Sequence, residues 1–201
     1  MIYVVRYKAR VPEGSITIDS TSRSFGWDRG LSPFFVGPVD LCNGFVSKNF
    51  ENAWQFSKVY KQHVGEDGNP TDEYWKWAKA GWSDTWAHRY PMGRGAIPEY
   101  SQWLGEKLGY IAARKRIYIP VYSTAVQKTK AYNKLMEEAK QAEDQGKDLY
   151  IRDFDGYNNK ELGMSYDDVI NCESRKMGHG FVLAMLLEMG HVAVLKMVLK
   201  K

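Results

Sequence analysis

The sequence contains few cysteines, no long apolar run and none of the short motifs typical of common hydrolases and nucleoside triphosphatases. Its 201 residues include only Cys42 and Cys172, which lack CxxC spacing. This predicts two buried free thiols in a reduced, cytoplasmic compartment rather than a disulfide framework. The longest apolar run, residues 181–187, is too short to cross a bilayer. The absence of G-x-S-x-G and P-loop patterns excludes the usual α/β-hydrolase and P-loop classes.

Histidines are also few, and their spacing argues against a zinc site. His63, His88, His179 and His191 have no metal-ligand spacing with the cysteines or with one another, so we expect no metal and no other cofactor. Residues 1–8 become charged too early for a signal peptide and alternate like a strand. We therefore expect a cytoplasmic protein without a membrane partner. The sequence does not indicate an oligomeric state.

Acidic residues are absent from residues 107–134, which hold most of the excess positive charge of a chain with a formal net charge of +4. Basic residues alternate with tyrosines here, a composition that suits a surface following a phosphate backbone and stacking on bases. Arg114, Lys115 and Arg116 are the candidate contacts to a nucleic-acid backbone. The alternative is a solvated helix face whose tyrosines pack inward, and both interpretations stay open.

Length and patterning predict an α+β fold, mostly helical, with a small mixed sheet, in one domain spanning residues 1–201. The 44% hydrophobic content suffices for one core. We expect strands at 2–8, 15–19, 117–122 and 149–151, and helices at about 49–64, 71–80, 98–112, 124–145 and 178–198. The strand–helix–strand order over 117–151 predicts a βαβ unit, and the C-terminal ends of its parallel strands face ligands by default. Asp153 and Asp155 follow at that point.

The segment 49–58 contains the clearest candidate site. In the expected helix, Glu51, Gln55 and Lys58 recur at i, i+4 and i+7, so they span about 60° of one face at about 100° per residue. Gln62 extends this stripe by one turn, and apolar residues border it on both sides. A largely buried helix must find partners for such polar groups, and the wall of a ligand cleft is one place for them. The alternative is a solvated face on which Glu51 supports Lys58.

The E-x-x-x-Q-x-x-K pattern, with its aromatic flanks and the preceding stretch Leu31–Phe35, resembles the NADAR superfamily. Members of that family carry an S-x-F stretch followed by an E-H-x-x-Q-x-x-K helix, and here Asn52 stands where they often have His. Looser similarities are Arg94 after a glycine, the acidic stretch 149–158, and Gly178–His179–Gly180 before an apolar helix. Where the family has an Asp followed by Trp-Gly, this chain has Asp155-Gly156-Tyr157.

The resemblance covers the order of elements over about residues 25–190 and leaves the basic middle of the chain unmatched. It implies a NADAR-like fold and a metal-independent hydrolase of N-glycosidic bonds, acting on nucleotides or on ADP-ribosylated bases with essential acidic residues. The motif Gly178–Gly180 has two interpretations that stay open: an anion site at a helix N-terminus, or close packing of the helix start.

Cleavage of an N-glycosidic bond passes through an oxocarbenium-like sugar, so it requires a carboxylate near the anomeric carbon and a donor for the departing base. Aromatic planes for the base and cations for phosphate complete the requirement. The candidate carboxylates are Glu51, Asp153 and Asp155, of which the resemblance favours Asp155 over Asp153. The candidate substrate-binding residues are Gln55 and His179 as donors, Phe34, Trp54 and Tyr157 as planes, Lys58 and Arg94 as phosphate ligands, and Asn158.

Three functions follow from these observations. The first is a DNA glycosylase that excises a modified base, because the basic, tyrosine-bearing middle is where the chain departs from the family pattern. The second is an N-glycosidase on a free nucleotide or an ADP-ribosylated base. The third is a non-catalytic nucleotide- or nucleic-acid-binding module, which would keep Lys58 and Arg94 without needing Glu51. The pathway, whether anti-phage defence, repair or metabolism, does not follow from the residues.

Overall fold

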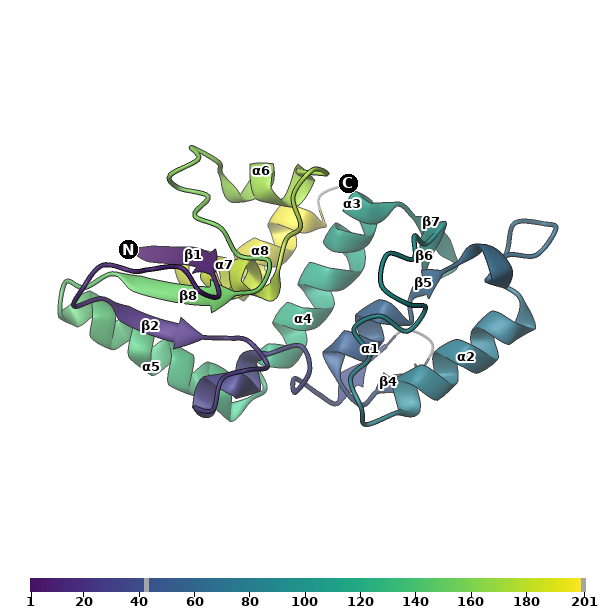
Figure 1. The fold of residues 1–201 in the computed structure, drawn as a ribbon, viewed down its shortest axis with the longest axis horizontal. Helices are drawn as coiled ribbons and strands as arrows, with labels where there is room; N and C mark the ends of the chain where they lie inside the picture. Colours follow the sequence, from purple (N-terminus) through teal and green to yellow (C-terminus); the bar gives the residue numbers. More distant parts are fainter. Residues whose placement is uncertain (42–43, 200–201) are drawn as a thin grey trace.

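The main sheet has its last strand in sequence at its centre. In the computed structural model, which describes residues 1–41 and 44–199, β8 (Leu149–Asp153) lies between β1 (Ile2–Arg6) and β2 (Ile16–Asp19), and both pairings are parallel. Figure 1 shows this sheet on one side of the molecule. Because the strands are parallel, their C-terminal ends meet at one edge, where Arg6 lies in register with Asp153.

The remaining strands form two small antiparallel sheets. One pairs β3 (Val39–Asp40) with β4 (Val46–Ser47), and the other has the order β5 (Lys58–Val59), β6 (Tyr100–Trp103), β7 (Glu106–Leu108). The helices are α1 (Phe50–Gln55), α2 (Asp72–Ser83), α3 (Tyr110–Ala113), α4 (Ile119–Val126), α5 (Lys130–Asp144), α6 (Tyr166–Asn171), α7 (His179–Met189) and α8 (His191–Val198), with short turns η1 (Trp27–Leu31), η3 (Lys61–His63) and the π-helical η4 (Arg114–Tyr118).

α4 lies between the sheet-bearing half of the molecule and the half that contains α1, α2 and β5 to β7 (Figure 1). α7 packs against β1 and β8, and α5 lies along β2. The eight residues of α7 from 179 to 186 are buried, as expected for the central core helix. Helices hold 43% of the residues and strands 15%. The predicted fold class, α+β with helices predominating, is therefore confirmed, with three small sheets in place of one mixed sheet.

Several expected elements were wrong. Residues 117–122 form helical turns and not a strand: Ile117, Ile119 and Tyr122 are buried in the protein core, and the helical backbone continues from α3 through η4 into α4. The predicted βαβ unit over 117–151 is therefore absent from the described structure. The predicted helix 98–112 is mostly a hairpin of β6 and β7, since Leu104 and Gly105 adopt positive φ angles of 48° and 81°, the combination that a two-residue hairpin turn requires.

Other expected helices are shorter. The helix predicted at 49–64 ends at Gln55, and the chain then enters β5, which pairs with β6. Thr129 caps a new helix by accepting the Tyr132 N–H at 3.1 Å, which divides the segment predicted as one helix at 124–145. Gly190, with φ of 77°, separates α7 from α8, so the helix predicted at 178–198 is two helices.

Among the described residues, no single helix has both the length and the apolar character needed to cross a membrane. α7 and α8 together meet that criterion of length and composition, but they are bent by 119° at the break between them.

Candidate functional site

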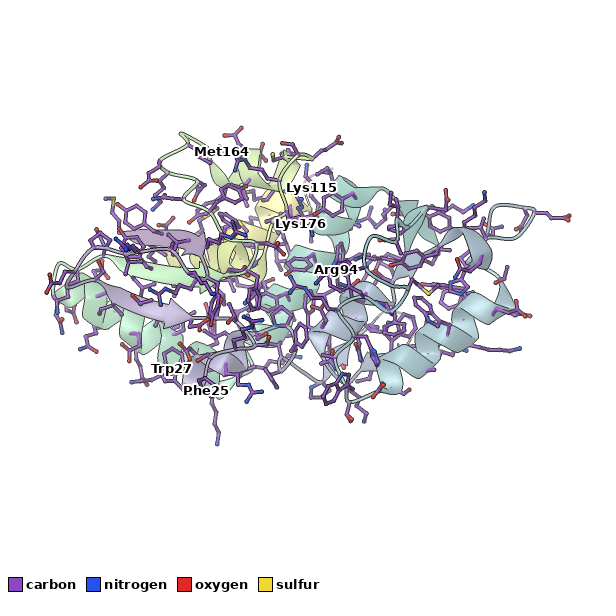
Figure 2. All side chains as sticks on the ribbon, viewed as in Figure 1. Phe25, Trp27, Arg94, Lys115, Met164 and Lys176 are labelled. Atoms are coloured by element: carbon purple, nitrogen blue, oxygen red, sulfur yellow. The ribbon has the colours of Figure 1, made fainter. Side chains whose placement is uncertain are left out.

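A cavity of about 310 Å³ lies where the C-terminal edge of the main sheet faces α1. Its lining includes Glu51, Gln55, Lys58, Arg89, Asp153, Asp155, Lys176 and His179. These come from α1, from β5, from the loop after α2, from the end of β8 and from the start of α7. Figure 2 shows Lys176 in the middle of the molecule, between its two halves. Glu51, Gln55 and Lys58 therefore belong to a cleft wall and not to a solvated face.

The polar stripe is a hydrogen-bonded chain. The Gln55 amide nitrogen donates to Glu51 Oε1 at 2.9 Å, and Lys58 Nζ donates to Gln55 Oε1 at 2.8 Å. Lys58 lies outside the helix, in β5, so its side chain meets Gln55 through the turn that follows α1. The predicted extension to Gln62 is wrong, since Gln62 is exposed and its amide approaches the Met92 sulfur at 3.9 Å.

Burial alters the ionisation of this chain. It raises the pKa of the Glu51 carboxyl, while the hydrogen bond from Gln55 and the charges of Lys58 and Arg89 act in the opposite direction. Burial also lowers the pKa of Lys58 to about 8, an effect that Glu51 opposes and Lys176 increases. Both groups are thus displaced toward neutrality, the usual condition of acid–base groups in an active site.

Asp153, the last residue of β8, is the anion bound by the N-terminus of α7. Its Oδ2 accepts the Gly180 backbone N–H at 2.7 Å and lies 3.4 Å from His179 Nδ1. A Cβ added to Gly178 would lie 2.0 Å from Asp153 Oδ2, so only glycine allows this approach. The close-packing interpretation of Gly178–Gly180 is thus confirmed, and the backbone N–H of Gly180 is taken by a side chain of the same protein.

His179 has protein partners on both ring nitrogens. Nε2 lies 2.8 Å from the Ser20 carbonyl oxygen, which can only accept, so Nε2 carries a hydrogen. Nδ1 lies 3.4 Å from Asp153 Oδ2. His179 therefore positions Asp153. It is not free to donate to a substrate, which was the role predicted from the sequence.

Asn52, which replaces the histidine frequent in the resembled family, holds a loop over the cavity. Its buried amide donates to the carbonyls of Asp84 at 3.1 Å and Trp86 at 2.8 Å, and it accepts the His88 N–H at 2.8 Å. Arg89, which follows His88 in this loop, lines the cavity and lies 3.9 Å from Asp155. Asn52 thus positions Arg89, which sequence reasoning missed because the loop has no periodicity and its anchor is 36 residues away.

Aromatic residues supply the apolar part of the cavity. Phe34 and Trp54 line it as expected, and the Lys58 ammonium lies 4.9 Å from the centre of the Trp54 ring. Tyr118 was not expected here; it packs edge-on against Trp54 at 5.1 Å, and burial raises the pKa of its hydroxyl well above the ordinary value. The sequence places Tyr118 in an apolar run that was predicted to be a strand, so it was not expected to line the cavity.

Three predicted substrate-binding residues lie outside the cavity. Arg94 is exposed, 5.7 Å from the ring of Tyr90, although both of its glycine neighbours line the cavity (Figure 2). Tyr157 packs on Phe181, with ring centres 4.7 Å apart, and lines a second hollow. Asn158 lines that hollow too, and its Oδ1 accepts the Glu161 N–H at 3.3 Å.

The basic segment does not form the surface that we expected. Arg114 is only 2% exposed, and its guanidinium donates to the carbonyls of four residues: Val169, Ile170, Cys172 and Arg175. Its role is therefore to hold the connection between α6 and α7 at the wall of the cavity, and it does not belong to an exposed surface for a phosphate backbone. Arg116 pairs with Glu106 at 2.8 Å. Lys115 is partly exposed near α3 (Figure 2).

Cys172 is a free thiol, as predicted, but it is half-buried and not fully buried, with its sulfur 3.3 Å from Ser174 Oγ. That contact lowers the pKa of the thiol. Cys42 lies outside the described residues. Within residues 1–41 and 44–199, no group of three or more His, Cys, Asp or Glu side chains is arranged to hold a metal ion.

Comparison with known proteins gives one relationship. No curated protein and no solved structure matches the chain. One family model, described as a family of unknown function (DUF6939), matches residues 4–164, which include Glu51, Lys58, Arg89, Asp153 and Asp155 but end before His179. Because this match covers well over half of the sequence, the chain belongs to the DUF6939 family.

Proposed function

We propose that this protein hydrolyses an N-glycosidic bond of a nucleotide or of an ADP-ribosylated base, with Glu51 and Asp153 as its two essential carboxylates. The observation that supports this most is that Glu51, from α1, and Asp153, from the end of β8, line one cavity together with the cations Lys58 and Arg89. The motif from Glu51 to Lys58, through its resemblance to the NADAR superfamily, supports the same reaction class.

Glu51 is suited to transfer a proton. Its Oε1 is held by Gln55 at 2.9 Å, and burial raises its pKa. A carboxylate with a raised pKa is a stronger base than an exposed one. We assign Glu51 the removal of a proton from the attacking water.

Asp153 is suited to stabilise positive charge on the sugar. The Gly180 N–H and His179 fix its carboxylate before any substrate binds. A fixed anion beside a developing oxocarbenium ion stabilises the transition state without reorganisation. Asp155, which is partly exposed and near Arg89, is a weaker candidate for this role.

The remaining requirements are met by neighbouring groups. Because both nitrogens of His179 face protein acceptors, the donor to the departing base is Gln55 or Lys58, each of which has a further N–H beyond the bonds described. Phe34 and Trp54 provide the planes for the base. Lys58, Arg89 and Lys176 provide positive charge for phosphate.

A free nucleotide or ADP-ribosylated base is the first candidate substrate. The cavity volume of about 310 Å³ is at the small-ligand end of the usual range, and the burial of Arg114 removes the centre of the predicted backbone surface. A modified base in DNA is the second candidate, which one observation favours. Tyr90 and Tyr110 line the cavity and are 42% and 48% exposed, so they could stack on the neighbours of a flipped base.

The test is a survey of base release. The purified protein is incubated with nucleoside monophosphates, a nicotinamide dinucleotide, an ADP-ribosylated nucleobase, and single-stranded and duplex DNA carrying modified bases, and free base is measured by mass spectrometry. We expect release from at least one small nucleotide substrate and a loss of at least about 100-fold in Asp153→Asn. Asp144→Asn, at an exposed position of α5, is the matched control. No release from any substrate, or release unaffected by Asp153→Asn, contradicts the proposal.

A further inference from the structure

A second hollow, of about 890 Å³, adjoins the cavity and is called the outer hollow below. Phe154, Asp155 and Lys176 line both spaces, so these three residues form a shared wall. The rest of the lining comes from the end of β1 and the segment that follows it, and from residues 156–161 with Arg175. The cavity therefore adjoins a larger space that the proposed reaction does not use.

The outer hollow carries an excess of positive charge. Four cations line it, Arg6, Arg10, Arg175 and Lys176, against the two acids Asp155 and Glu161. All four cations are exposed, and in the described part of the chain none of them has a carboxylate within 4.0 Å. Their N–H groups are thus available to an incoming anion.

Sheet register places the two spaces next to each other. Arg6 ends β1 directly beside Asp153, which ends β8. At this edge of the sheet, Asp153 lines the cavity and Arg6 lines the outer hollow. Gly156 keeps the strands and the following turn close, because a Cβ there would lie 2.3 Å from the Val5 carbonyl oxygen. Phe154, Asp155 and Lys176 are therefore the residues that a ligand occupying both spaces would contact from either side.

We propose that the outer hollow binds a second nucleotide unit, joined through phosphate to the nucleotide whose base is released in the cavity. Linking phosphates match the charge of Lys176, Arg6 and Arg10. The ring of Tyr157, with the Arg175 guanidinium 5.2 Å from its centre, offers a surface for the distal sugar or base. This inference rests on the proposed function and defines its substrate class: a dinucleotide-sized molecule and not a mononucleotide.

The test measures binding by isothermal titration calorimetry with adenosine monophosphate, diadenosine diphosphate and the phosphodiester-linked dinucleotide ApA. We expect at least one linked dinucleotide to bind the wild type at least tenfold more tightly than the monophosphate. The tighter of the two shows whether the site accommodates a pyrophosphate or a phosphodiester linkage. The double variant Arg6→Ala/Arg10→Ala should remove this advantage and change binding of the monophosphate by less than twofold.

The control variant Lys8→Ala/Lys115→Ala removes two positive charges outside the outer hollow and should keep the advantage. Equal affinities of the wild type for all three probes, or equal losses in both double variants, would overturn the inference. Affinity and base release are separate readouts, so a failure of base release overturns the proposed reaction and leaves this binding result to be judged separately.

Discussion

At the scale of single residues, the ionisation of Lys58 gives the most direct prediction. Burial lowers its pKa to about 8, so the ammonium is present at pH 7 and is lost as the pH rises through about 8. Because this ammonium would bind the phosphate of the substrate, we expect kcat/KM to fall as the pH rises above about 8. In Lys58→Arg the guanidinium stays charged, so the alkaline fall should disappear. Profiles of kcat/KM against pH that keep the same alkaline fall in both proteins would assign it to another group.

Arg114 is a second residue whose role differs from that of its sequence neighbours. Its guanidinium holds four backbone carbonyls, two in α6 and two in the segment between α6 and α7, and a lysine ammonium cannot replace this fork geometry. We expect Arg114→Lys to lower the free energy of unfolding by about 3 kcal/mol, measured by urea denaturation. Lys115→Ala, at the next position, should change it by less than about 0.5 kcal/mol. Similar values for the two variants would mean that Arg114 has no anchoring role.

At the scale of elements, the start of α7 depends on the absence of a side chain at Gly178. A Cβ there would lie 2.0 Å from Asp153 Oδ2, so Gly178→Ala must displace either the helix or the carboxylate. We expect a loss of stability of about 2 kcal/mol and a fall in base release of at least about tenfold. Gly109→Ala is the control, since φ is −67° and nothing lies within 4 Å of its added Cβ. A Gly178→Ala protein as stable and active as this control would show that the contact has no consequence.

Elements with a local signal were the ones that sequence reasoning predicted well. The alternation in residues 2–8 is such a signal, and a strand forms there; the helix predicted at about 71–80 is α2, which Thr71 caps. Residues 117–122 were wrong because an apolar run is compatible with a buried strand or a buried helix, and packing decides between them. The polar stripe from Glu51 to Lys58 was found by helical spacing, although Lys58 reaches it from β5. Arg89 could not be found, because contacts distant in sequence bring it to the cavity.

At the scale of the whole molecule, the net charge of +4 is not gathered into one backbone-binding stripe. Arg114 is buried and Arg116 is paired with Glu106. For a nucleotide substrate we therefore expect a shallow decrease of log kcat/KM with log salt, of slope about 1 to 2, and no change in slope for Lys115→Ala/Arg116→Ala. A steep slope with DNA that this double variant flattens would instead restore the backbone role and favour the DNA glycosylase.

The central claim is that Glu51 serves the reaction and not the fold. Glu51→Gln keeps the size of the side chain and retains an oxygen that can accept from Gln55, so the hydrogen-bonded wall of the cavity can persist. The decisive measurement is base release by this variant beside its free energy of unfolding. We expect release to fall at least about 100-fold while the free energy of unfolding stays within about 1 kcal/mol of the wild type. Full activity in the variant, or activity that falls only in proportion to the unfolded fraction, would contradict the claim.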